Sequence, residues 1–424
     1  MLDLRLIRDN TEFVKAEIAK LGEEAPIDAI VALDVRRREI LTEVEQLRAE
    51  RNEGSREIGR KPAGPERDAQ IKAMREVGDR IEILDEELKQ VDADLHRALI
   101  HVPNLPDPDV PEGASEDENV VTGEFGTKRQ FDFEPRPHWE LGEELGIIDF
   151  ERGVKISGSR FYLLRGAGAR LQRALISWFL DVHTLEQGFA EVYPPVLVKT
   201  EALVGTAQIP KFEDSQYKTT TGDHWLIPTA EVPVTNMYSG EILDADQLPI
   251  YHCAYSPCFR REQFSAGRDV RGIKRGHQFD KVELVKFVHP DHSNDELYSL
   301  VEQGSLLLER LGIPYRHVQM CTGDLSFVAA KKIDIEVWAP GCDEWLEVSS
   351  CSNFRDFQAR RAGIRFRPES GSSTDFVHTL NGSALALPRM MIAVIENYQN
   401  SDGSITVPDV LRPYMGGIEQ ITPS

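Results

Sequence analysis

The chain has 424 residues, of which 41% are hydrophobic, enough for a substantial core and for two or three domains. Its net charge of −22 at pH 7 excludes a surface that binds nucleic acid everywhere, because phosphate contacts supply much of that affinity. No run of about 18 apolar residues occurs and the N-terminus lacks an apolar signal segment, so we expect a cytoplasmic protein with no membrane partner.

Two segments near the N-terminus, 30–58 and 74–98, carry apolar residues at alternating spacings of three and four. This spacing predicts a heptad seam on each of two helices. Residues 59–65 between them contain Gly and Pro, which break helices, so we expect the pair to fold back as an antiparallel coiled-coil arm. At 1.5 Å per residue, helices of about 33 residues make an arm roughly 50 Å long.

The charge of this arm differs from that of the rest of the chain. Residues 36–75 hold eleven basic and eight acidic side chains, a local charge of +3. A basic segment on an acidic body indicates a localised nucleic-acid contact. A dimerisation coil is the alternative, although such a coil would favour apolar residues where the seam has Arg37 and Arg51, unless both snorkel to water.

A boundary follows the arm, because residues 101–111 contain four prolines, too many for a helix or a central strand. We therefore expect an arm domain over 1–105, a Pro-rich and acidic linker over 106–119, and a second domain over 120–424. Strand-like runs such as 160–164 and 333–337 alternate there with helical stretches such as 171–185. This pattern predicts a mixed domain around one large sheet.

Charged residues occupy two strand-like runs within residues 258–283, where buried strands carry Val or Ile. Residues two apart share a face of a strand, so Arg260 and Glu262 point the same way, and so do Lys281 and Glu283. A guanidinium beside a carboxylate suits an anion held next to a donor group. An exposed hairpin with alternating salt bridges is the alternative.

Five sequence blocks resemble the motifs of a known family and occur in that family's order. Phe-Arg-x-Glu at 259–262 and His-Gln-Phe-x-Lys-Val-Glu at 277–283 resemble motif 2 of class II aminoacyl-tRNA synthetases (near 252–287), in the form typical of bacterial seryl-tRNA synthetases. The other blocks resemble the family's serine-binding loop at 229–231, its ATP and magnesium block at 347–350, motif 1 near 171–198 and motif 3 near 381–398. The resemblance spans essentially the whole chain.

The resemblance implies an α+β protein whose helical arm precedes a catalytic domain with an antiparallel sheet flanked by helices. It implies a serine–tRNA ligase that converts L-serine and ATP to seryl-adenylate and pyrophosphate and then transfers serine to the terminal adenosine of tRNA(Ser). In the family the arm grips the long variable arm of the tRNA by shape, motif 1 builds a homodimer, and Mg²⁺ accompanies ATP. Whether a selenocysteine tRNA is also charged is left open.

The resemblance also implies roles for ATP-binding residues. Arg260 would bridge the α-phosphate and the serine carboxylate, and Arg389 would hold the γ-phosphate; these two are the catalytic candidates. Glu262 would accept a hydrogen bond from the adenine amine while Phe279 stacks on the ring. Arg261 is a further ATP candidate, although strand alternation directs its side chain away from the site. The remaining ATP candidates are Arg275, Gly276, Glu347, Val348, Ser349 and Ser350.

Glu347 and Ser350 match the family's magnesium positions, and a carboxylate with a hydroxyl suits a hard cation. A straight strand would pair Glu347 with Ser349 on one face, so either the strand bends or the assignment is shifted by one. A polar turn at 349–352 is the alternative.

The serine-binding candidates implied by the resemblance are Thr229, Ala230, Glu231, Arg260, Glu283 and Ser383. Two carboxylates can neutralise the serine ammonium, and a site that hydrogen-bonds the hydroxyl rejects alanine. Alternatively, Glu231 and Glu283 are strand-edge acids paired with Lys281 or Arg261.

Departures and the cysteines complete the sequence-based expectations. Ala207, Ala384 and Pro388 stand where many relatives have Gly, and Pro is well tolerated in the first turn of a helix. The five cysteines include no CxxC pair, so we expect plain small hydrophobes, with neither disulfides nor zinc. Two rival functions are an enzyme that loads an amino acid on a carrier protein and a non-enzymatic coiled-coil scaffold.

Overall fold

The computed structural model describes residues 1–262, 271–369 and 371–423. The chain divides into two compact units, one of Met1–Ala19 and Glu23–Pro103 and the other of Lys20–Gly22 and Asn104–Ser424. Among the described residues, no helix combines the length and the apolar character needed to cross a membrane.

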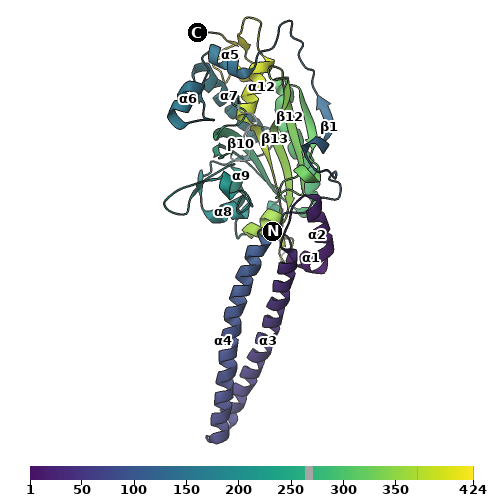
Figure 1. The fold of residues 1–424 in the computed structure, drawn as a ribbon, viewed down its shortest axis with the longest axis vertical. Coiled ribbons are helices and arrows are strands. Elements are labelled where there is room, and N and C mark those ends of the chain that lie inside the picture. Colours follow the sequence, from purple (N-terminus) through teal and green to yellow (C-terminus); the bar gives the residue numbers. More distant parts are fainter. Residues whose placement is uncertain (263–270, 370, 424) are drawn as a thin grey trace. The chain divides into compact units, whose positions relative to one another are not determined.

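The helical arm predicted from the heptads is confirmed. After α1 (Leu4–Asp9) and α2 (Thr11–Lys20), α3 (Ile27–Arg60) and α4 (Pro65–Leu99) run side by side (Figure 1). Their seam buries Ile40, Val44, Ile81, Leu84 and Val91. The break is shorter than predicted, because α3 includes Gly59 and Arg60. Pro65 opens α4, where its missing amide proton leaves no helix bond unmade.

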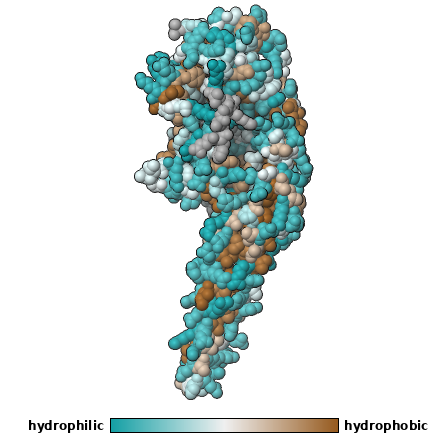
Figure 2. Space-filling view, viewed as in Figure 1, coloured by the Kyte–Doolittle hydropathy of each residue, from teal (hydrophilic) through white to brown (hydrophobic). Residues whose placement is uncertain are grey.

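Salt bridges between the two helices show that they are antiparallel and divide the arm into two zones. Arg36 pairs with Glu87 at 2.7 Å, and Glu43 pairs with Arg80 at 2.8 Å, so positions rise on one helix as they fall on the other. Arg37 and Arg48 also pair with acids of α4. On the face of the arm shown in Figure 2, hydrophilic residues flank a broken stripe of hydrophobic ones.

Towards the turn that joins α3 and α4, the basic residues are not paired. In the described part of the chain no salt bridge involves the following tip residues: Arg51, Arg56, Arg60, Lys61, Lys72 and Arg75. The basic segment found in the sequence is therefore neutralised near the base of the arm and unneutralised at its tip.

The second unit is built on one large sheet, as predicted. Within the described ranges it has eight strands in the order β1 (Val120–Phe125), β11 (Tyr315–Gln319), β12 (Lys331–Ala339), β13 (Glu344–Arg355), β16 (His378–Ala386), β10 (Gln278–Val288), β9 (Ile250–Phe259) and β4 (Ala190–Glu191). Neighbouring strands are antiparallel except β4 and β9. The antiparallel catalytic sheet implied by the resemblance is thus confirmed.

The two faces of this sheet differ. Side chains of α7 (Gly166–Leu185), α10 (Ser293–Leu311) and α12 (Leu387–Asn397) form the main core on one face, together with Val282 and Leu284 of β10. Strand alternation places Lys281 and Glu283 on the other face. There, Val285 and Phe287 pack with residues of α9 (Glu231–Asn236) and α11 (Phe357–Ala362) in a smaller core.

Shorter elements surround the sheet: the helices α5 (His138–Glu144), α6 (Phe150–Ser157) and α8 (Thr200–Gly205), and the strands β2 (Ile148–Asp149), β3 (Leu163–Leu164), β5 (Leu197–Val198), β6 (Tyr217–Lys218), β7 (Trp225–Leu226), β8 (Ile242–Asp244), β14 (Arg365–Arg367), β15 (Asp375–Phe376), β17 (Ile405–Thr406) and β18 (Gln420–Ile421). The predicted strand at 160–164 is wrong at its start: Arg160 has a φ of 61°, which an extended strand does not allow, and only Leu163 and Leu164 pair.

Candidate active site

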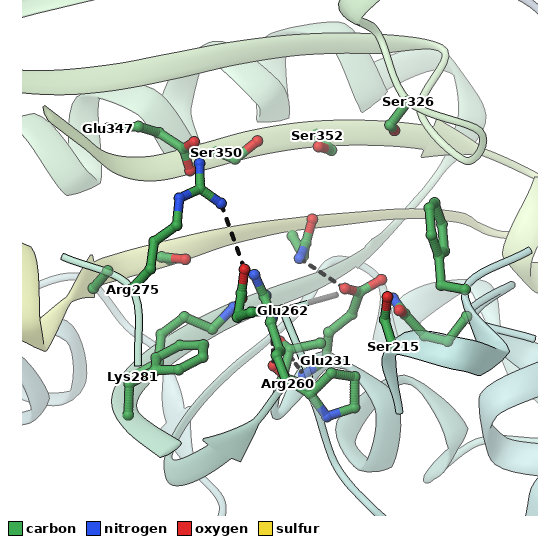
Figure 3. Close-up of a pocket in the computed structure, with 18 of the residues that line it drawn as sticks. Ser215, Glu231, Arg260, Glu262, Arg275, Lys281, Ser326, Glu347, Ser350 and Ser352 are labelled. Atoms are coloured by element: carbon green, nitrogen blue, oxygen red, sulfur yellow. Dashed lines mark hydrogen bonds and ion pairs between the residues drawn. The ribbon is translucent and has the colours of Figure 1, made fainter. Parts of the chain in front are cut away.

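A cavity of about 430 Å³ opens on the sheet face that carries Lys281. Its walls come from β10, β13 and β16, from the first turn of α12, and from the loop that leads into α9. Figure 3 shows charged side chains entering this space from opposite walls. A concave site with converging charged groups is the usual form of a small-molecule site.

The predicted charged hairpin forms one wall. β9 and β10 pair antiparallel from Ile250 opposite Phe287 to Phe259 opposite Gln278. Arg260 lies one residue beyond β9. Its backbone N–H donates to the His277 carbonyl at 2.9 Å, which adds one hydrogen bond between the two chain segments beyond the end of the paired strands. Its guanidinium carbon lies 5.2 Å from the centre of the Phe279 ring, and its Nε donates to the Pro228 carbonyl at 3.3 Å.

Glu262 shares the cavity with Arg260, as predicted, but for a different reason. The strand has ended by this point and Glu262 has a φ of 47°, so strand alternation does not aim its side chain. A left-handed residue turns the chain, and Glu262 Oε2 lies 3.6 Å from Nη1 of Arg275. The guanidinium of Arg275 lies between the carboxylates of Glu262 and Glu347 (Figure 3).

A bulge in β13 resolves the spacing of Glu347 and Ser350. Glu347 faces Glu336 of β12, whereas Ser349 faces Ile335, so Val348 is an extra residue without a partner. One inserted residue reverses the alternation. Glu347 and Ser350 therefore both line the cavity, while the Ser349 hydroxyl is buried within 3.5 Å of the Cys351 sulfur. The strand bends, and a polar turn at 349–352 is excluded by the pairing through Asn353.

Positive charge surrounds Glu347. Nη1 of Arg389 donates to the Glu347 carbonyl at 2.5 Å and lies 3.6 Å from its carboxylate. Desolvation acts to raise the pKa of Glu347, but Arg389, Lys332, Arg260 and Arg275 outweigh it and the pKa is lowered. Glu347 is therefore ionised at neutral pH.

The same neighbourhood fits a divalent cation. Asp334, opposite Ser350 on β12, has a pKa raised by burial and by the charge of Glu347. Within the described residues its buried Oδ1 has no hydrogen-bond partner. Carboxylate and hydroxyl oxygens are the ligands that Mg²⁺ prefers, and a cation here would offset the two neighbouring carboxylates.

A second pair of carboxylates consists of Glu231, which lines the cavity, and Glu283 beneath it. Glu231 accepts from Gln358 Nε2 at 2.6 Å and from Asn381 Nδ2 at 3.1 Å, and the same Asn381 nitrogen donates to Glu283 at 2.6 Å. Lys281 forms an ion pair with Glu283. Burial, followed by the charge of Glu283, raises the pKa of Glu231 to about 7. Both acids are buried in this network, so the alternative that they are strand-edge acids is wrong, although the pairing of Glu283 with Lys281 that it included is present.

The departures in motif 3 do not disrupt the local structure. Pro388 stands in the first turn of α12, and both it and Arg389 line the cavity. Ser383 faces Glu283 across β16 and β10 and also lines the cavity. Leu385 next to Ala384 has a φ of 71° at a register shift in β16. Ala207 also has a positive φ of 60°, which explains why glycine suits that position better.

The cavity gathers most of the residues singled out in the sequence. Those that line it are Thr229, Glu231, Arg260, Glu262, Arg275, Gly276, Phe279, Glu347, Val348, Ser350, Ser383 and Arg389. The side chains of four others do not: Ala230 and Ser349 are buried elsewhere, Arg261 is exposed, and Glu283 reaches the cavity only through Asn381 and Lys281. The loop between the two motif 2 strands, with Arg268 and Arg271, is in the sequence a candidate for closing over ATP or for meeting the tRNA acceptor end; Arg268 lies outside the described residues.

Several lining residues carry no separate prediction. Lys281 and Asn381 stand inside the quoted blocks, so their polar side chains on a buried strand were the available signal. Lys274, Lys332 and Ser352 also line the cavity. Gln358 lies on α11, outside every quoted block and 127 residues from Glu231 in sequence, and its contact with Glu231 exists only because the fold brings α11 beneath β16.

Comparisons with known proteins agree with this geometry. Residues 211–398 match the family model described as tRNA synthetase class II core domain (G, H, P, S and T), and residues 1–106 match the seryl-tRNA synthetase N-terminal domain. The serine–tRNA ligase of Thermomicrobium roseum is 63% identical over 99% of this chain and 95% of its own length. The seryl-tRNA synthetase of Pyrococcus horikoshii, solved with ATP, is 40% identical, with a TM-score of 0.95 over 100% of both chains.

An antiparallel sheet carrying motif 2, the bulged acidic strand and the arginine of motif 3 around one cavity defines a class II aminoacyl-tRNA synthetase. The match of the N-terminal helices and the full-length relatives identifies the subgroup. The chain belongs to the seryl-tRNA synthetases, the family of serine–tRNA ligases.

Proposed function

We propose that this chain activates L-serine with ATP in the cavity described above and transfers it to the 3′-terminal adenosine of tRNA(Ser). The single observation that carries the proposal is the convergence on one cavity of Arg260 from the β9–β10 hairpin, the ionised Glu347 from β13 and the buried Glu231 from α9. A cation site beside an ammonium site is what the joining of ATP and an amino acid requires.

In the activation step the serine carboxylate attacks the α-phosphorus of ATP and pyrophosphate leaves. Arg260 holds the attacking carboxylate and the α-phosphate, which brings two anions together. Phe279 presents its ring to the adenine and Glu262 accepts from the adenine amine, while Arg275 and the Gly276 backbone contact the phosphates. Arg389 holds the γ-phosphate and thereby favours pyrophosphate as the leaving group.

Glu347 and Ser350 would hold Mg²⁺ with the ATP phosphates, and the ion supplies charge neutralisation. The orphaned Oδ1 of Asp334 supports this assignment because a cation nearby would stabilise its ionised form. The chain's own contribution is to orient the carboxylate and hydroxyl by the bulge at Val348.

Serine recognition rests on Thr229, Glu231 and Ser383 at the cavity surface. Glu231 receives the ammonium, and Asn381 spreads the interaction to Glu283 beneath it. The hydroxyl of Ser383 contacts the substrate side chain, so alanine leaves a polar group unpaired. Lys281 balances the charge of Glu283.

The arm supplies the tRNA contact. Its unpaired tip residues, such as Arg51, Arg56 and Arg60, are the ones free to meet phosphates, whereas the basic residues nearer the base are already paired with acids. Phosphate contacts by lysine and arginine position the backbone without reading bases. This arrangement favours tRNA binding over a dimerisation coil and over a carrier-protein enzyme, whose family relatives lack the arm.

Motif 1 builds the homodimer. Leu185 at the end of α7 is 79% exposed and Tyr193 is 90% exposed, an unusual state for large hydrophobic side chains near one another in sequence. A second copy of this chain would cover them. We expect the purified protein to sediment as a dimer. A monomer at all concentrations would contradict the motif 1 assignment.

The function is tested by exchange of labelled pyrophosphate into ATP with a panel of amino acids. We expect exchange with serine, abolished by Arg260→Ala, and exchange only with another amino acid contradicts the proposal. Aminoacylation is then measured separately with tRNA(Ser) and tRNA(Sec) transcripts. Charging of tRNA(Ser) is required, while the second transcript decides whether the variable-arm shape alone suffices.

A further inference from the structure

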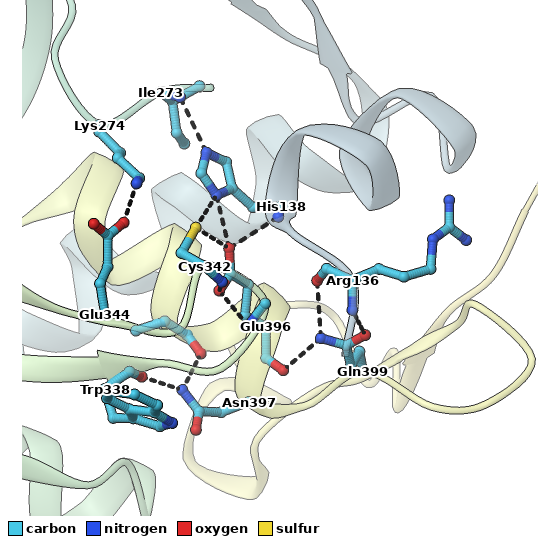
Figure 4. A network of polar contacts seen from close by, with 12 residues as sticks. Arg136, His138, Ile273, Lys274, Trp338, Cys342, Glu344, Glu396, Asn397 and Gln399 are labelled. Carbon is cyan, nitrogen blue, oxygen red and sulfur yellow. Dashed lines mark hydrogen bonds and ion pairs between the residues drawn. The ribbon is translucent and has the colours of Figure 1, made fainter. Parts of the chain in front are cut away.

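A buried polar cluster lies outside the cavity and behind one of its walls. His138 and Glu396 are fully buried, and Cys342 is half-buried beside them. They come from α5, from α12 and from the turn between β12 and β13 (Figure 4). None of the three touches the cavity, so the roles proposed above leave the cluster unexplained.

Glu396 gathers hydrogen bonds from two other segments. Its Oε1 accepts the His138 backbone N–H at 2.9 Å and lies 2.8 Å from the His138 Nδ1. Its Oε2 accepts the backbone N–H groups of Gly341 and Cys342 at 2.9 and 3.1 Å. The Cys342 thiol donates to Oε1 at 3.1 Å. One carboxylate on α12 thus fixes both α5 and the β12–β13 turn.

His138 continues this connection toward motif 2. The backbone N–H of Ile273 donates to His138 Nε2 at 3.2 Å, so Nε2 is the acceptor and Nδ1 carries the proton that Glu396 receives. A metal bound to Nδ1 would place the proton on Nε2 instead, against the Ile273 N–H. The tautomer therefore favours a hydrogen-bonded support over a His–Cys–Glu metal site.

The segment held by His138 carries two residues of the cavity wall. Lys274 and Arg275 follow Ile273 directly and both line the cavity. Lys274 also pairs with Glu344, which belongs to the strand that leads to Glu347. Gly272, with a φ of +73°, approaches so closely that a Cβ there would lie 1.9 Å from His138 Nε2. The segment is thus seated against the imidazole by shape as well as by a hydrogen bond.

We propose that His138 and Glu396 are positioning residues for ATP, which hold the end of the motif 2 loop and the motif 3 helix in one fixed relation. Both cations flank Glu347, because Nη1 of Arg389 lies 3.6 Å from its carboxylate and the guanidinium of Arg275, on the held segment, lies beside the same carboxylate (Figure 3). Misplacement of either cation by about 1 Å weakens phosphate binding strongly. This inference rests on the proposed function, because it assigns these cations to ATP.

The test compares two conservative variants in serine-dependent pyrophosphate exchange. His138→Gln places a side-chain oxygen near the former Nε2 and retains an acceptor for Ile273, whereas His138→Asn retains the donor to Glu396 and loses that acceptor. We expect His138→Asn to raise the KM for ATP about tenfold with the KM for serine unchanged, and His138→Gln to stay within about threefold. Thermal unfolding of both variants reports folding separately.

Gly272→Ala tests the same seat from the other side, because its Cβ would push the segment away from the imidazole while His138 and Glu396 keep their own side chains. It lies in a loop, and we expect a similar selective rise in the KM for ATP. Equal rises in both KM values, or a loss of kcat alone in proportion to unfolded protein, overturn the positioning role. One zinc ion per chain in the purified protein, lost in Cys342→Ser, also overturns it.

These outcomes are distinct from failure of the proposed function. If wild-type protein gives no serine-dependent exchange, the function is wrong and the His138 variants are uninformative for ATP. If wild-type protein exchanges normally and both His138 variants match it in the KM for ATP, only the positioning role is wrong. Cys342→Ser retains a donor to Glu396 and is expected to exchange like wild type.

Discussion

The arm and the cavity both concentrate charge, but they hold it in different surroundings. At the arm tip, Arg51, Arg56 and Arg60 are exposed and form no salt bridge within the described chain. In and beneath the cavity, Glu231 and Lys281 are buried and joined to fixed partners. Exposed charge acts through attraction that salt screens, whereas buried charge acts through geometry that salt barely alters.

The exposed basic residues at the arm tip explain how a chain with a negative net charge can bind a polyanion. The net charge of −22 describes the whole protein, yet the base of the arm cancels its basic residues against acids of α4 while the tip leaves them available. Specific placement of a few cations matters more than the total. The predictions that follow separate the two regions by their kinetics, their pH dependence and their salt dependence.

The largest effect is expected in the cavity. Arg260→Ala removes the guanidinium that we propose to bridge the two reacting anions, and we expect pyrophosphate exchange to fall about a thousandfold. Arg261→Ala is the matched control, because its side chain is exposed and does not line the cavity. It should stay within about threefold of wild type. Similar losses in both variants would mean that the hairpin, and not Arg260, supplies the effect.

The arm tip is tested by replacing Arg51, Arg56 and Arg60 with alanine together. We expect the KM for tRNA to rise about 10- to 100-fold and its dependence on salt to weaken, while pyrophosphate exchange is unchanged. The matched control replaces Arg36, Arg37 and Arg48, which are already paired with acids. A larger rise in the control than in the tip variant would contradict the division of the arm into two zones.

The pH dependence of serine binding tests the buried acids. The pKa of Glu231 is raised to about 7, so the carboxylate that we propose to receive the serine ammonium forms as pH rises through that value. We expect the KM for serine to fall by up to about tenfold per pH unit as pH rises towards 7. Glu231→Gln should show a high KM without this dependence. A wild-type KM that is flat from pH 6 to 8 would be incompatible with this pKa.

The same shift has a consequence for stability. A carboxyl whose pKa is raised from 4.5 to about 7 retains a proton in the folded state that the unfolded chain has released. The contribution of Glu231 is therefore fully present below the unfolded pKa and is lost as pH rises through the folded pKa. Without serine, Glu231→Gln should flatten the stability profile between these values, as measured by urea unfolding.

The smallest effect is expected from one exposed pair in the arm. Arg37→Ala removes a 2.7 Å contact with Asp92, and both side chains are partly exposed. We expect a loss of about 1 kcal/mol or less, measured by hydrogen exchange of the α3 and α4 amides. Arg51→Ala, which breaks no pair, should change these amides less. A loss above about 2 kcal/mol would show that the seam depends on this pair.

The arm, the hairpin and the order of the motifs follow from local patterns in the chain. Heptad spacing predicts that the apolar stripes of two helices pack against each other. Alternation on β10 places Lys281 and Glu283 on the face of the sheet opposite to the main hydrophobic core. Both are short-range periodicities, readable without knowledge of distant partners. Each motif block is contiguous in sequence, so the resemblance alone names most of the predicted site residues that line one cavity.

The places where the periodicity breaks, and the distant groups that meet, follow from the folded domain. The bulge at Val348 joins Glu347 with Ser350 on one face, and the turn at Glu262 brings that side chain to Arg275. Gln358 donates to Glu231, which lies in a distant segment of the chain. His138 likewise joins Glu396 to Ile273, and these three residues come from three separate segments. Bulges, left-handed residues and long-range hydrogen bonds follow from packing of the whole domain, and no local pattern encodes them.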